Sequence, residues 1–85
     1  MKFVSAEGKT YVDSAFIGAV QYAVEGAELH HMGFGEFYLT TPVGKVEFDR
    51  MRGVPFAGQS GRSHLVYGDE AAVALVMGAS VKEAA

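Results

Sequence analysis

The sequence predicts a small α+β domain, in which an antiparallel sheet carries one or two helices on one face. The chain has 85 residues, enough for a single domain spanning 1–85. Short runs of alternating apolar and polar residues, separated by glycine-bearing turns, predict strands. Two alanine-rich stretches predict helices. The expected order along the chain is strand, strand, helix, strand, strand, strand, helix.

The first two strands are expected to form a hairpin. Lys2–Ser5 and Thr10–Asp13 flank the run Glu7-Gly8-Lys9, where glycine supplies the positive φ of a tight turn. Asp13 and Ser14 are residue types that cap helices, so a helix is expected to begin directly afterwards.

That helix is expected over residues 15–29, because Phe16, Val20 and Val24 recur one turn apart. The alternation of Val20, Tyr22 and Val24 leaves a strand as the alternative. His30 and His31 are placed at the helix end, where the dipole favours cationic side chains. Adjacent residues of a helix diverge, so we expect no metal site at this pair.

The run Gly33-Phe34-Gly35-Glu36-Phe37 resembles the Gly-Phe-Gly-x-Phe step of the HU-type histone-like proteins. The resemblance covers five residues only, and the two long leading helices and the basic arm of that family are missing. No family follows from it. We interpret the run as a turn from helix to strand, in which Phe34 and Phe37 pack into the core.

The second half of the chain is expected to begin with a hairpin of strands 36–41 and 45–51. A further strand is expected over 64–67 and a helix over 70–77, for which a buried strand is the alternative. The glycine-rich loop 52–63 lies between. Its Gly53 to Gly58 spacing is like that of a P-loop, but glutamine stands where lysine should be. A backbone anion site assisted by Arg62 is the alternative to a plain loop.

Composition excludes several classes of protein. The chain has no cysteine, which removes thiolate chemistry and cysteine metal sites and fits a reducing compartment. No membrane-spanning segment or secretory signal is evident, so we expect a cytoplasmic protein with no membrane partner. The bias towards Ala, Gly and Val is typical of a GC-rich bacterium or its phage. So small a core suggests a homodimer.

Charge separates one segment from the rest. Residues 45–64 carry four basic and two acidic residues, for a net of +2, while the remainder carries −5. The basic residues are Lys45, Arg50, Arg52 and Arg62. Arginines of this kind bind phosphates and carboxylates, but an overall charge of −3 argues against nucleic acid.

We therefore expect a non-enzymatic interaction protein, such as a phage-encoded or mobile-element factor or an inhibitor, that binds a protein partner. The partner or anion surface is expected to include these residues of the 50–64 segment: Arg50, Arg52, Phe56, Arg62 and His64. No catalytic residue, metal or cofactor is expected. The alternatives are nucleic-acid binding by the four basic residues and a small enzyme with a dimer-interface site around His64.

Overall fold

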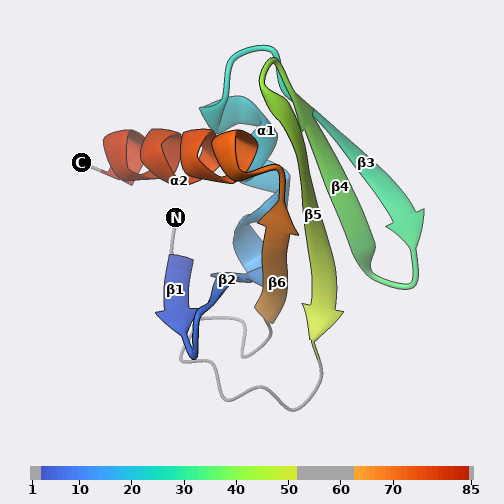
Figure 1. Cartoon of the computed structure of the whole chain (residues 1–85). Coiled ribbons are helices and arrows are strands. Elements are labelled where there is room, and N and C mark those ends of the chain that lie inside the picture. The colour runs from blue at the N-terminus through green and yellow to red at the C-terminus, as the bar shows by residue number, and fades with distance from the viewer. Residues whose placement is uncertain (1–2, 52–62, 85) are drawn as a thin grey trace.

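The computed structural model describes residues 3–51 and 63–84, which form an antiparallel sheet with helices on one face (Figure 1). This arrangement confirms the α+β class. The strands are β1 (Phe3–Ala6), β2 (Lys9–Asp13), β3 (Glu28–Gly33), β4 (Glu36–Thr41), β5 (Gly44–Met51) and β6 (Ser63–Gly68). The helices are a 3-10 turn η1 (Ser14–Phe16), α1 (Ile17–Ala23) and α2 (Glu70–Ala84).

The six strands lie in the order β1-β2-β6-β5-β4-β3. Strand β6 is the last in the chain, yet it lies in the middle of the sheet and pairs with both β2 and β5. It therefore joins an N-terminal hairpin to a three-stranded meander. Residues of η1, which follows β2, are brought beside β6 by this pairing.

The first hairpin is as predicted, and its turn geometry can be stated. Ala6 pairs with Lys9, so Glu7 and Gly8 form a two-residue loop. Their φ angles are 53° and 76°. Positive φ at both central positions is what a type I′ turn requires, and this turn matches the right-handed twist of the strands.

The expected helix over 15–29 is shorter than predicted, and a strand replaces its C-terminal part. Helix α1 ends at Ala23, after which Ala27 N donates to Val24 O across a β-turn. Gly26 lies in that turn at φ 79°, a conformation that no helix interior contains. Gly26, within the predicted helix, was the signal for this break, because glycine is unfavourable in a helix interior. The chain order therefore holds one more strand, β3, than expected.

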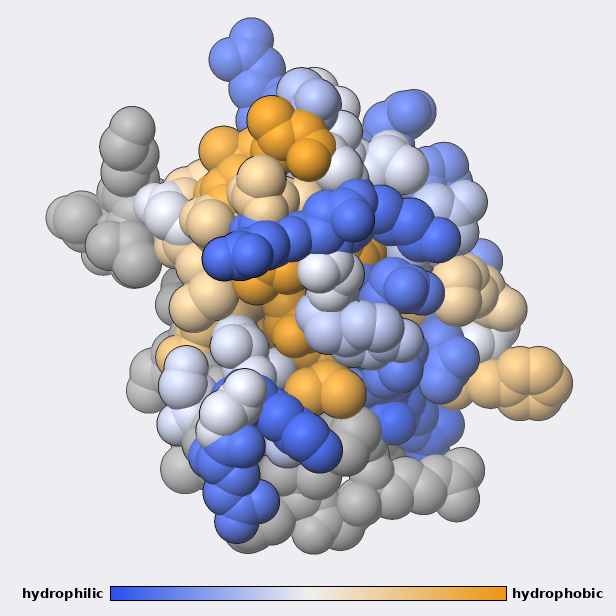
Figure 2. All heavy atoms as spheres, viewed as in Figure 1, coloured by the Kyte–Doolittle hydropathy of each residue, from blue (hydrophilic) through white to orange (hydrophobic). Residues whose placement is uncertain are grey.

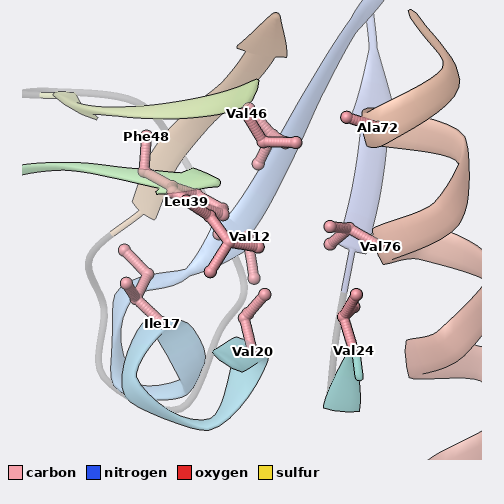
Figure 3. Packing of buried hydrophobic residues seen from close by; sticks show 10 residues of the cluster. Val12, Ile17, Val20, Val24, Leu39, Val46, Phe48, Ala72 and Val76 are labelled. Carbon is pink, nitrogen blue, oxygen red and sulfur yellow. The ribbon is translucent and has the colours of Figure 1, made fainter. Parts of the chain in front are cut away.

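The core lies between the helix-bearing face of the sheet and the two helices (Figure 3). Phe48 in β5 and Leu39 in β4 are fully buried, and Val20 of α1 and Val76 of α2 close over them. Alternation along the strands puts every second side chain on this face. The core includes Val12, Ile17, Val20, Val24, Leu39, Val46, Phe48, Val66, Ala72 and Val76.

The C-terminal segment is a helix, so the alternative of a buried strand is wrong. It follows β6 through Gly68 and Asp69. The Asp69 carboxylate accepts a hydrogen bond from Lys45 N at 2.8 Å, and Asp69 N donates to Lys45 O at 2.9 Å. Asp69 thus fixes the start of α2 to the start of β5. Among the described residues, no helix is long and apolar enough to cross a membrane.

Candidate functional site at the β3–β4 hairpin tip

Two of the predicted binding residues, Arg50 and His64, lie side by side in the sheet. They are direct cross-strand partners in β5 and β6. Alternation from Phe48 and Val66 puts both on the helix-bearing face. Arg50 is exposed, whereas His64 is only 6% exposed. The other predicted residues, Arg52, Phe56 and Arg62, lie outside the described ranges.

The imidazole of His64 links three segments of the chain. Its Nε2 lies 2.6 Å from Gly35 O, and its Nδ1 lies 2.7 Å from Ser14 Oγ. A carbonyl oxygen can only accept, so Nε2 carries a proton and donates a hydrogen bond to Gly35 O. In the neutral ring Nδ1 is then the acceptor for the Ser14 hydroxyl. The ring therefore connects β6 to η1 and to the tip of the β3–β4 hairpin.

That tip is a second two-residue hairpin loop. Gly33 pairs with Glu36, which leaves Phe34 and Gly35 as the central residues. Their φ angles are 54° and 78°, again the signs of a type I′ turn. Asparagine, aspartate and glycine are the residues that adopt the first of these positions at little cost. Phenylalanine there holds a bulky side chain in the left-handed region.

The expectation that Phe34 packs into the core is wrong, because its side chain is 95% exposed. The run 33–37 joins strand to strand rather than helix to strand, so its first aromatic residue lies at the turn and points outwards. Phe37, two residues into β4, is half-buried against the core as expected. In the space-filling view, apolar atoms project from the side of the molecule where the β3–β4 hairpin lies (Figure 2).

Arg50 also lies against this turn. A Cβ built on Gly35 would lie 2.7 Å from Arg50 Cδ and 3.5 Å from a guanidinium nitrogen. The arginine side chain therefore lies over the Gly35 backbone, and a larger residue at position 35 would have to displace it. His64 and Arg50, adjacent in the sheet, thus both lie against the same turn residue: His64 bonds its carbonyl oxygen, and Arg50 lies beside its backbone.

The histidine pair lies on an edge strand rather than at a helix end, which corrects the prediction. His30 stacks on Tyr38 with ring centroids 4.6 Å apart, and His31 stacks on Phe37 at 4.7 Å. Each histidine is the direct cross-strand partner of the ring on which it stacks. Because successive residues of a strand alternate, the two lie on opposite faces of the sheet. The described residues contain no group of side chains suited to a metal ion.

The basic residues of β5 also lie on opposite faces. Lys45 Nζ lies over the ring of Tyr38 at 4.7 Å from its centroid, on the face away from the helices. Arg50 is five residues further along β5, roughly 17 Å at the usual rise of a strand, and faces the other way. These two cations do not form one patch, so the described part of the chain lends the nucleic-acid alternative no support.

No protein family model, curated protein or solved structure matches this chain. The candidate site rests on geometry alone. Sequence reasoning selected Arg50 and His64 but missed Phe34, Gly35 and Ser14. A signal existed in the run Phe34-Gly35, which matches Glu7-Gly8 of the first hairpin in having glycine second.

Proposed function

We propose that this chain is a cytoplasmic interaction protein that inserts Phe34 into an apolar pocket of a partner protein. The observation that carries the proposal is the exposure of that phenylalanine, 95%, at a backbone conformation with φ 54°. The side chain gains no burial from its own fold. A ring of this size gains about 1.5–3 kcal/mol when it is buried.

The turn residue also costs stability. A left-handed conformation costs a residue other than glycine about 1–2 kcal/mol. Asparagine is less strained than phenylalanine in this backbone conformation. Phenylalanine at position 34 therefore makes the fold less stable but provides a protruding aromatic ring. Such trades are characteristic of binding sites.

The tip is held in place before any partner binds. His64 donates to Gly35 O from a buried position, and Arg50 packs over the Gly35 backbone. A rigid anchor loses less conformational entropy on binding than a mobile one, so more of the burial energy remains as affinity. His64 and Arg50 are thus assigned as positioning residues for Phe34.

The surroundings of Phe34 suggest the chemistry of the partner. Met32 is 45% exposed two residues earlier, and Arg50 is exposed beside the turn. Aromatic residues and arginine are the most frequent hot-spot residues of protein interfaces. The partner is expected to offer an apolar pocket with a carboxylate at its rim, which would pair with the guanidinium.

The test replaces Phe34 by a photo-crosslinking phenylalanine analogue in cells that make the protein. We expect a discrete adduct with one partner protein, which is then purified for affinity measurements. Phe34→Asn should weaken that binding about 30-fold or more, the effect of losing a hot spot worth at least 2 kcal/mol. The same variant should have a free energy of unfolding higher by about 0.5–1 kcal/mol, measured by urea unfolding, because asparagine favours the backbone conformation of this turn.

Glu7→Asn is the matched control, since it places asparagine at the same position of the other type I′ turn. It should stabilise the fold without changing the affinity for the partner. An adduct of twice the chain mass would identify the partner as a second copy. Crosslinking at position 34 that yields no discrete adduct, or Phe34→Asn binding as tightly as the native chain, would refute the proposal.

A further inference from the structure

Ser14 and His64 form a hydroxyl–imidazole pair, of which the binding proposal uses only the His64 bond to Gly35. The Ser14 Oγ lies 2.7 Å from His64 Nδ1. Ser14 is the first residue of η1, directly after the Asp13 N-cap, whose carboxylate accepts from Ala15 N at 3.0 Å. The backbone that carries the hydroxyl is therefore fixed. The imidazole is fixed independently by its bond to Gly35 O.

The direction of the hydrogen bonds follows from the acceptor at the far end of the ring. Because Nε2–H donates to Gly35 O, the lone pair of the neutral ring is on Nδ1 and faces Ser14. The serine proton then lies along the bond to the imidazole. A nucleophile (Ser14), a base (His64) and a group that orients the base (Gly35 O) are thus joined by successive hydrogen bonds, the arrangement used in covalent catalysis by serine.

We propose that Ser14 is a nucleophile, activated by His64 as general base, that accepts a small acyl group from an ester. Oγ attacks the ester carbonyl carbon while Nδ1 takes the hydroxyl proton. The bond to the alcohol oxygen then breaks, and the alcohol leaves with the proton from Nδ1. Water attacks the acyl-serine with Nδ1 again as base, which releases the carboxylic acid and restores the hydroxyl.

Burial limits which esters can react. Ser14 is half-buried and His64 is 6% exposed. The expected donor is therefore an ester with a compact acyl group, such as acetyl. The orienting group is an uncharged carbonyl rather than a carboxylate, which stabilises the imidazolium less. Turnover is therefore expected to be slow.

The experiment incubates the folded full-length chain with p-nitrophenyl acetate, measures nitrophenolate release and maps the acetylated residue by mass spectrometry. We expect acetyl on Ser14. Ser14→Ala should abolish that acylation, and His64→Gln should slow it about 100-fold or more, the usual effect of losing a general base. Ser5→Ala removes an exposed serine of β1 and should change nothing.

Since His64→Gln also removes the bond to Gly35, a measurement on the native chain is added. Acylation of Ser14 should disappear when the protein is unfolded in urea, where Ser14 and His64 separate. Acetyl on lysines or other serines alone, or equal acylation of Ser14 in urea, would overturn the proposal. Phe34→Asn leaves Ser14 and His64 untouched, so it should lose the partner and keep the acylation, which separates the two proposals.

Discussion

At the scale of single residues, strand pairing determines which residues a polar side chain contacts. His64 meets Arg50 and Gly35 because β6 pairs with β5 and packs beside the hairpin tip. On the opposite face, Tyr67 of β6 lies diagonally across from Asp49 of β5 and donates to its Oδ2 at 2.8 Å. These contacts span 18 to 29 residues of chain, so neither can be inferred from local pattern.

The Tyr67 contact gives a prediction about alkaline pH. The hydrogen bond to Asp49, with the nearby charges of Asp49, Glu47 and Glu36, raises the pKa of Tyr67 from 10.0 to about 12. In the unfolded chain this pKa returns towards 10.0. The protonated phenol therefore stabilises the fold fully below pH 10.0, and this contribution is lost as the pH rises through about 12.

Spectrophotometric titration of the tyrosines checks this prediction. Tyr67→Phe should remove a transition near pH 12, and Asp49→Ala should move that transition down towards 10.0. If Tyr67→Phe instead removed a transition at the ordinary value of 10.0, the hydrogen bond would have no effect on the ionisation.

At the scale of elements, glycines decide where the first helix stops and the sheet begins. Gly18 lies on the exposed side of α1, where a Cβ would meet nothing within 4 Å. Gly26 lies in the turn before β3 at φ 79°, where a Cβ would lie 3.2 Å from Pro42 Cγ. Gly18 therefore destabilises the helix, whereas Gly26 is required for the turn that ends it.

The same substitution should therefore have opposite effects at the two positions. Gly18→Ala should raise the free energy of unfolding by about 0.5–1 kcal/mol, because alanine favours helix and restricts the unfolded chain. Gly26→Ala should lower it by about 1–2 kcal/mol, because alanine is strained in the left-handed region. Urea unfolding of both variants measures the two values, and changes of the same sign would contradict this account of the helix end.

At the scale of the whole molecule, one core holds the hairpin, the meander and the helices together. Phe48 is at its centre: β4 and β6 pair on either side of β5, and the ring is fully buried. A domain of 85 residues has an expected unfolding free energy of roughly 4–13 kcal/mol. Loss of the Phe48 ring is expected to remove a large part of that free energy.

Phe48→Ala should lower the free energy of unfolding by about 3–5 kcal/mol, through lost burial and the cavity left behind. Phe48→Leu should cost less than about 1.5 kcal/mol. Both are measured by urea unfolding followed by circular dichroism. Val43→Ala, at an exposed turn position, is the control and should change stability by less than about 0.5 kcal/mol. A Phe48→Ala variant as stable as this control would show that the core is not centred on β5.

The amino-acid sequence by itself determined the class of the fold and most of its elements. The glycine turn predicted the β1–β2 hairpin, alternation predicted the β4–β5 hairpin, and alanine content predicted α2, because these depend on neighbours a few residues apart. The sequence also indicated Arg50 and His64. It misassigned His30 and His31, because Leu29 to Met32 carries no clear periodicity and β3 depends on pairing with β4.

Only the tertiary structure decided which residues form a site. The insertion of β6 between β2 and β5 brings Ser14, Gly35 and His64 together from three distant segments. The exposure of Phe34 follows from its place in the two-residue turn that the pairing of β3 with β4 creates. Local pattern fixes the period of a strand, but pairing fixes its register, and register determines what each side chain meets.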